Sequence, residues 1–205
     1  GAIDRVAMRT QRHTELELDI VDLSHEGRGV ARVDGKACFV AGALPGEKVR
    51  AKITRGHRQF DEAEVLEVLV AAPNRVVPAC PHFGVCGGCA LQHLDPAAQI
   101  AAKEHNLLEN LERIGKVTPG RLLPALSGSP WGYRRRGRLS AKWVAKKDKL
   151  LIGFRELDGR FVADLTRCPV LDPKVGADFA PLAALITGMD AKLTIPQIEI
   201  AIGDE

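Results

Sequence analysis

Residues 48–54 read KVRAKIT and residues 15–23 read ELELDIVDL. In both stretches apolar and polar residues alternate with a period of two, which is typical of β-strands that bury one face. The alternation and the turns between the runs predict about five short strands within residues 14–72, the size of a small OB-like barrel. Such barrels are common platforms for oligonucleotides, although an SH3-like barrel fits the same number of strands. The turns fall at Glu26-Gly27, Asp34-Gly35 and Pro45-Gly46.

The chain after residue 72 mixes helices and strands. Asp95 followed by Pro96 is a typical helix start, and one face of the following stretch is apolar. That face consists of Ile100, Leu107, Leu108, Leu111 and Ile114. The expected elements are this helix up to Gly115, strands within 134–166, a second helix from Asp172-Pro173 towards Gly188, and a strand at 195–203.

These elements predict an α+β fold in two parts. A small OB-like β-barrel at residues 14–72 is followed at residues 73–205 by an α/β central domain. Because the chain stops directly after a strand that needs a pairing partner, we expect the central domain to be truncated at its C-terminus. We expect residues 1–13 to form a disordered or extended N-terminal segment.

Composition places the chain among soluble globular proteins. Its 205 residues are 45% hydrophobic, without an apolar run long enough to span a bilayer. The N-terminus, GAIDRVAMRTQRH, lacks the apolar segment of a secretory signal. We therefore expect a cytoplasmic monomer with no membrane partner. Five cysteines in a reducing compartment favour metal ligands or redox groups over disulfides.

The net charge of +3 is small, but the charge is unevenly distributed. Residues 134–149 read RRRGRLSAKWVAKKDK, in which eight cations are opposed by Asp148 alone. A second basic run, residues 48–58, contains no acid. Concentrated cations favour a phosphate backbone through counterion release, and the aromatic residues beside both runs could stack on bases. The charge pattern alone leaves two readings open, an RNA-binding surface and a solvated charged face.

Three cysteines lie in CPHFGVCGGCALQH, residues 80–93, with the spacing C-x5-C-x2-C. A fourth, Cys168, follows far along the chain and precedes a proline. Three local thiols and one remote Cys-Pro fit an iron–sulfur cluster better than the two close pairs of a zinc ribbon. A zinc site completed by His82 or His93 and a set of unligated thiols remain as alternatives.

The two glycines of CGGC have a specific expected use. Gly87 and Gly88 let the backbone pass close to a metal without a Cβ clash, and their N–H groups can donate to sulfur. The fifth cysteine, Cys38 in GKACFV, fits an ordinary buried strand position.

Several motifs in order resemble one known family. They are SHEGRGVARVDGK, FVAGALPGEKV, CPHFGVCGGCALQHL, WGYRRRGRLS, LLIGFRE and TRCPVLDP. From residue 14 onward the chain is similar to the N-terminal half of the bacterial 23S ribosomal RNA (uracil-5-)-methyltransferases. These are the iron–sulfur branch, with a TRAM domain, of the RNA 5-methyluridine methyltransferases. The most specific element is C-x5-CGGC together with the remote Cys-Pro.

This resemblance implies a 4Fe-4S cluster held by Cys80, Cys86, Cys89 and Cys168. It also implies that residues 14–72 form a TRAM barrel that binds RNA, with 23S rRNA as the partner. Members of the family use S-adenosylmethionine and carry the nucleophilic cysteine and the general-base glutamate in a further domain. Because no such residues can be named here, we expect this chain to bind RNA without methylating it.

The candidates for RNA contact come from the two basic runs. Cations at the barrel rim would surround a stacking ring, and the arginines would contact phosphates, with Arg135 and Arg136 on opposite faces of a strand. Two alternatives remain, a non-enzymatic RNA-binding module with a zinc-stapled four-cysteine site and a tRNA uracil-C5 methyltransferase. The candidate residues are Lys52, Arg55, His57, Arg58, Phe60, Tyr133, Arg134, Arg135, Arg136 and Arg138.

Overall fold

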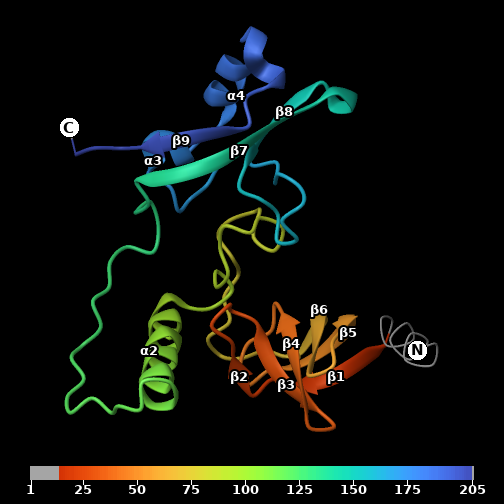
Figure 1. Ribbon diagram of the computed structural model, residues 1–205, viewed down its shortest axis with the longest axis vertical. Helices are drawn as coiled ribbons and strands as arrows, with labels where there is room; N and C mark the ends of the chain where they lie inside the picture. The colour runs from red at the N-terminus through yellow and green to blue at the C-terminus, as the bar shows by residue number, and fades with distance from the viewer. Residues whose placement is uncertain (1–13, 205) are drawn as a thin grey trace. The chain divides into compact units, whose positions relative to one another are not determined.

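The computed structural model describes residues 14–204, so the expected N-terminal segment at 1–13 lies outside the described residues (Figure 1). The chain divides into two compact units. The N-terminal unit joins the chain up to Val77 with His93–Ala125, and the cysteine unit joins Pro78–Gln92 with the chain from Leu126 onward. Residues 93–125 therefore group with the strands, whereas the sequence assigned them to the central domain.

The N-terminal unit is built on one six-stranded sheet of order β1-β5-β6-β4-β3-β2. All pairs are antiparallel except β4 with β6, and β1 also contacts β3, so the sheet curls around its own core. Six strands form instead of the expected five because a short strand, β2, pairs with β3. The strands are β1 (Glu15–Asp19), β2 (Asp22–Leu23), β3 (Gly29–Val33), β4 (Lys36–Ala41), β5 (Lys48–Gly56) and β6 (Phe60–Val70).

The predicted alternation of buried and solvent-facing residues is confirmed along β5. Val49, Ala51 and Ile53 are buried in the core, whereas the cations between them lie on the outer face. Cys38 is fully buried in β4, as its strand position indicated. Burial raises the pKa of the Cys38 thiol to about 11, so this thiol is unreactive at neutral pH.

A buried carboxylate, Glu47, ties the start of β5 to the chain that leaves the sheet. Its side chain has no exposed surface and lies against Arg75, with Nε and Nη2 each 2.8 Å from a carboxylate oxygen. The backbone N–H groups of Leu44 and Ala72 donate to the same carboxylate at 2.7 and 3.2 Å. Burial by itself would raise the pKa of Glu47, but these hydrogen bonds outweigh it and hold the pKa below its usual value.

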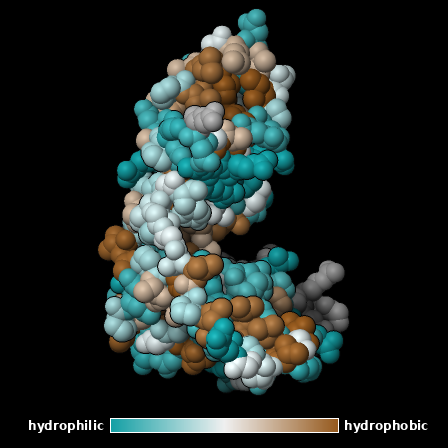
Figure 2. All heavy atoms as spheres, turned by 90° about the vertical axis from the view of Figure 1, so that its left-hand side faces the viewer, coloured by the Kyte–Doolittle hydropathy of each residue, from teal (hydrophilic) through white to brown (hydrophobic). Residues whose placement is uncertain are grey.

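The first predicted helix, α2 (Pro96–Arg113), begins as the sequence indicated. The Asp95 side chain accepts hydrogen bonds from the N–H groups of Ala97 and Ala98, which satisfies two free donors of the first turn. Its apolar side, however, is not buried: Leu107 is 55% exposed and Ile114 is 78% exposed. In Figure 2 the side carrying α2 faces the viewer, and hydrophobic residues are interspersed with polar ones on its surface.

The cysteine unit contains a three-stranded antiparallel sheet of order β8-β7-β9, so the last strand pairs with β7. The expected second helix is instead two helices. Pro181 lacks a backbone N–H and its ring would clash with the carbonyl of Ala177, so a continuous helix cannot pass this point. The elements are β7 (Arg136–Val144), β8 (Lys149–Gly153), α3 (Pro173–Gly176), α4 (Ala180–Thr187), β9 (Gln197–Ala201) and the 3₁₀ turns Ala145–Lys147 and Asp190–Leu193.

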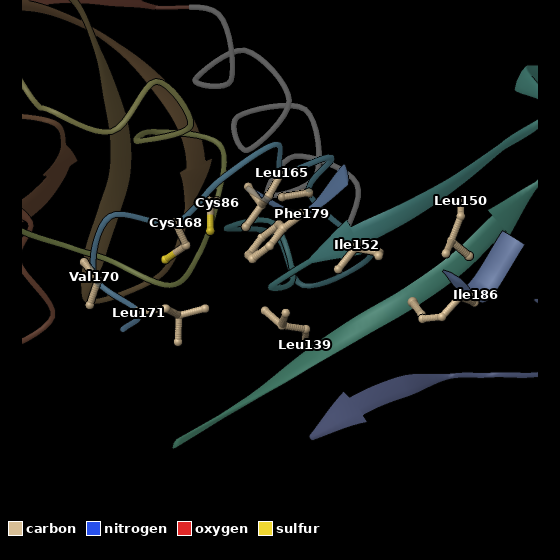
Figure 3. Packing of buried hydrophobic residues seen from close by; sticks show 12 residues of the cluster. Cys86, Leu139, Leu150, Ile152, Leu165, Cys168, Val170, Leu171, Phe179 and Ile186 are labelled. Atoms are coloured by element: carbon tan, nitrogen blue, oxygen red, sulfur yellow. The ribbon is translucent and has the colours of Figure 1, made fainter. Parts of the chain in front are cut away.

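The core of the cysteine unit lies beside its cysteines. Leu139 and Ile152 from the sheet pack with Phe179, and the same cluster includes Cys86 and Cys168 (Figure 3). The cysteine region is therefore continuous with the hydrophobic core. None of the helices within residues 14–204 is long and apolar enough to cross a bilayer.

Candidate metal centre and nucleic-acid interface

The four cysteines singled out by their spacing come together in the cysteine unit. Cys80, Cys86, Cys89 and Cys168 all line one pocket. The rest of its wall is largely apolar, and Arg134 and Arg167 are the positively charged residues that line it. Figure 3 shows the side chains of Cys86 and Cys168 close to the apolar core. The other lining residues are Phe83, Gly88, Gln92, Phe154, Leu165 and Val170.

Backbone hydrogen bonds shape the loop that carries the first three cysteines. The N–H of Cys86 donates to the carbonyl of His82, and the N–H of Gly88 donates to Cys86 Sγ at 3.4 Å. Gly87 has a different use from the expected one: its N–H donates to the carbonyl of Arg155, and a Cβ there would lie only 2.9 Å from that oxygen. Close packing on the chain after β8 thus requires the first glycine, and the second supplies the N–H to sulfur.

The remote cysteine is held by the end of α3, at Gly176. The N–H of Cys168 donates to the carbonyl of Gly176 at 2.7 Å. A Cβ on Gly176 would lie 2.4 Å from the Cys168 carbonyl oxygen, which no ordinary contact allows. Asp172 begins α3 by accepting the N–H of Lys174, with Pro173 at the first helical position. This turn presents Cys168 to the pocket.

The thiols of the pocket interact electrostatically. Burial raises the pKa of Cys86, and neighbouring thiolates would raise it further. Burial also raises the pKa of Cys89, although Arg134 acts in the opposite direction. Four thiolates in a largely apolar pocket would repel one another, so the donor set suits a group that brings several positive charges. Within residues 14–204 there is no group of three or more His, Cys, Asp or Glu side chains arranged to hold a metal ion.

The described residues that line the pocket include neither His82 nor His93, so neither histidine is placed as a fourth ligand. The ring of His82 faces Thr166, whose N–H and hydroxyl lie 3.3 Å from Nε2. His93 belongs to the N-terminal unit and is buried there. Burial, with a smaller contribution from Arg75, lowers the pKa of His93 to about 4. The alternative of a zinc site with a histidine ligand therefore has no support from these positions.

The structure separates the arginines of the basic segment. Arg134 lines the cysteine pocket, with its guanidinium 5.4 Å from the centre of the Phe154 ring. Arg135 pairs with Asp204, and Arg138 pairs with Glu199 at 3.1 Å. Arg136 is exposed and makes no ion pair within the described chain, and Tyr133 is 61% exposed. Arg136 is therefore the arginine of this segment most available to a phosphate.

The second group of candidates surrounds the tip of the β5–β6 hairpin. His57 stacks on Phe60 with ring centres 4.3 Å apart, so Phe60 is neither a free stacking ring nor a core residue. Arg55 and Arg58 are exposed, and neither makes an ion pair among residues 14–204. Lys52 lies between Glu15 and Glu64 in the strand register, which reduces the positive charge there.

Sequence reasoning missed several residues that shape these sites. Arg28 before β3, Phe39 in β4 and Glu62 in β6 contact one another or the hairpin group. Phe154 and Arg167 line the cysteine pocket. All of them except Glu62 lie within the motifs quoted above, but no motif indicates which distant residues they contact. Their positions depend on strand register and on the packing of segments far apart in the chain.

Comparisons with known proteins agree with the fold. Residues 9–66 match the TRAM domain family. The chain is 59% identical over 195 residues to "23S rRNA (uracil(1939)-C(5))-methyltransferase RlmD" of Xanthomonas oryzae pv. oryzae, with 94% of this chain and 44% of the relative covered. The chain is thus similar, over nearly its whole length, to part of the RlmD proteins. The RlmD protein of Stenotrophomonas maltophilia is 55% identical over the same length. The resemblance seen in the motifs is thereby confirmed.

A solved structure extends the comparison. The Pyrococcus abyssi tRNA (uracil-54, C5)-methyltransferase, in complex with S-adenosyl-L-homocysteine, is 25% identical with a TM-score of 0.51. The match covers 76% of this chain and 33% of that chain. The chain thus spans less than half the length of the RlmD relatives and about a third of this structural relative.

Proposed function

We propose that this chain is the RNA-recognition part of an S-adenosylmethionine-dependent RNA uracil-C5 methyltransferase that acts on 23S rRNA. The observation that carries the proposal is the 59% identity over 195 residues to a protein of that activity. The TRAM domain and the two exposed groups of cations support RNA as the partner. A tRNA substrate is the second candidate because the structural relative acts on tRNA, but its 25% identity is far lower.

The four-cysteine pocket supports a 4Fe-4S cluster as the bound group. Three local cysteines and one remote Cys-Pro line the same pocket, a pattern that favours a cluster over the two close pairs of a zinc ribbon. When bound, the cluster would supply a rigid cross-link between the loop of residues 80–89 and Cys168.

Metal content tests this proposal directly. We expect the chain purified without oxygen to be brown and to contain about four irons and four acid-labile sulfides. Iron, sulfide and zinc per chain, together with the visible spectrum, are the measurements. One zinc without sulfide would contradict the cluster and would favour a zinc-stapled RNA-binding module.

Methyl transfer and S-adenosylmethionine binding belong, in this proposal, to the longer protein. The cysteines of this chain are poor candidates for a nucleophile, because four line one pocket and Cys38 is buried with its pKa raised to about 11. The chain alone is therefore expected to bind RNA and leave uridine unmethylated. Binding to a 23S rRNA fragment, compared with tRNA at equal salt, distinguishes the two candidate substrates.

Arg136 provides a sharper test of RNA binding. We expect Arg136→Ala to reduce the slope of log affinity against log salt by about 0.7–0.9, because one phosphate contact is lost. Arg135→Ala is the matched control, since that side chain is already paired with Asp204. The measurement is RNA binding by fluorescence anisotropy at several salt concentrations. Equal slopes for wild type and Arg136→Ala would rule out a phosphate contact at this residue.

A further inference from the structure

The outer face of the N-terminal sheet carries an unusual group of aromatic side chains. Phe39 alternates with the buried Cys38 and Val40 in β4, and Phe60 precedes the buried Asp61 in β6. Both rings therefore lie on the side of the sheet away from the core. Their centres are 5.5 Å apart in an edge-to-face arrangement. A pair of partly exposed rings on the outer face of a barrel is a candidate contact surface.

The rings of this group are packed against neighbouring side chains. The guanidinium of Arg28 lies 5.3 Å above the centre of Phe39, and the imidazole of His57 stacks on Phe60 at an angle of 26°. Each phenylalanine thus has a partner on one face. The imidazole of this stack, His57, has a side chain that is 29% exposed. Because the imidazole covers one face of Phe60, a planar ligand can extend the stack at His57.

The orientation of the imidazole is set before any ligand arrives. Nε2 of His57 lies 3.3 Å from Oε2 of Glu62, and Oε1 of Glu62 accepts a hydrogen bond from Arg28 at 3.0 Å. The backbone N–H of His57 donates to the carbonyl of Phe60 and closes the hairpin tip. A ring held by packing, a carboxylate and a closed turn loses little freedom on binding, which favours affinity.

The charge around the stack suits a phosphodiester chain. Arg55 and Arg58 flank His57 at the hairpin tip, and both are exposed without an ion pair within the described residues. The nearby carboxylates of Glu26 and Glu62 are both engaged by Arg28. Asp61 is paired with Lys36. The free positive charge therefore lies directly beside the exposed ring.

We propose that His57 stacks against one unpaired RNA base, with Phe60 as its backing and with Arg55 and Arg58 at the flanking phosphates. This inference rests on the proposed RNA-binding function and adds to it the kind of RNA bound. A base in a duplex is already stacked on both sides, so only a single-stranded or bulged nucleotide can join the stack. Glu62 and Arg28 are positioning residues that hold the imidazole.

The test uses the 205-residue chain and a short single-stranded RNA with 2-aminopurine at its centre, whose fluorescence falls on stacking. A matched RNA has an abasic site at that position. We expect wild type to quench the 2-aminopurine and to bind the abasic RNA about ten-fold more weakly, the loss expected for one stacked base. We expect His57→Ala to abolish the quenching and to bind the two RNAs equally well, without changing the salt slope. We expect His57→Phe to restore the quenching and the difference in affinity.

Two controls separate this inference from the proposed function. Arg58→Ala should lower the salt slope while quenching persists, because it removes a phosphate contact. His105→Ala, at an exposed position on α2, should change neither quantity. One outcome is that wild type binds RNA while His57→Ala quenches the 2-aminopurine and binds both RNAs as wild type does. In that case the stacking inference is wrong and the RNA-binding function stands. If wild type binds neither RNA, the proposed function itself is wrong.

Discussion

Replacing Glu47 with alanine is expected to lower the free energy of unfolding of the N-terminal unit by about 3–5 kcal/mol, the usual cost of breaking a buried ion pair. The change leaves the Arg75 guanidinium without its carboxylate and removes the acceptor for the N–H groups of Leu44 and Ala72. Both consequences act where the loop before β5 meets the chain that follows β6. Urea denaturation monitored by circular dichroism measures the loss.

An exposed ion pair of the same sheet is the matched control for Glu47. Glu67 pairs with Arg50 at 3.1 Å, and its side chain is 56% exposed. We expect Glu67→Ala to cost less than about 1 kcal/mol because solvent screens this pair. A Glu47→Gln variant keeps an oxygen for the backbone N–H groups and should fall between the two. Equal stabilities of the Glu47→Ala and Glu67→Ala proteins would contradict a structural role for the buried pair.

The contribution of Glu47 to the free energy of unfolding should decrease as the pH falls. Its pKa in the folded chain lies below the usual value, so the unfolded chain takes up the proton first as the pH falls. The stabilisation is therefore complete above the unfolded pKa of about 4.3 and is lost as the pH falls through the folded value. This acid sensitivity should be absent in the Glu47→Gln protein.

Replacing Cys168 with alanine is expected to lower the iron content from about four per chain to less than about one. Cys168 is the single ligand candidate outside the 80–89 loop, and the turn held by Gly176 presents it to the pocket. Without it, one side of the proposed cluster has no thiolate. Iron, sulfide and visible absorbance, measured on protein purified without oxygen, give the result.

The fifth cysteine provides the control for this experiment. Cys38 is fully buried in β4 and does not line the pocket. We expect Cys38→Ala to keep its iron and to cost about 1 kcal/mol of stability from the small cavity. Because Cys168→Ala could also disturb packing, Cys168→Ser and the circular dichroism of the N-terminal unit report on folding separately. A Cys168→Ala protein that folds and retains four irons would rule out the proposed ligand set.

Local patterns predicted a large part of the fold. The period of two placed Val49, Ala51 and Ile53 in the core, and the Asp95-Pro96 pair marked the start of α2. These signals are local because the alternation of a strand and the cap of a helix involve residues within a few positions of one another. The break between α3 and α4 also has a local cause, Pro181, although one continuous helix was expected there.

Other features could not be predicted because they depend on contacts between distant segments. The parallel pairing of β4 with β6 sets Phe39 beside Glu62, and no motif specifies that register. The ion pairs that separate Arg135 and Arg138 from Arg136 come from residues near the end of the chain. Which cations remain free is therefore a property of the folded molecule.

The sequence by itself determined the strand pattern, the helix start and the set of four cysteines, because each is a matter of spacing along the chain. The tertiary structure alone decided that Cys168 shares a pocket with the other three and that His57 stacks on Phe60. The physical reason is that close packing selects one arrangement of remote side chains. Spacing along the chain limits such arrangements without choosing among them.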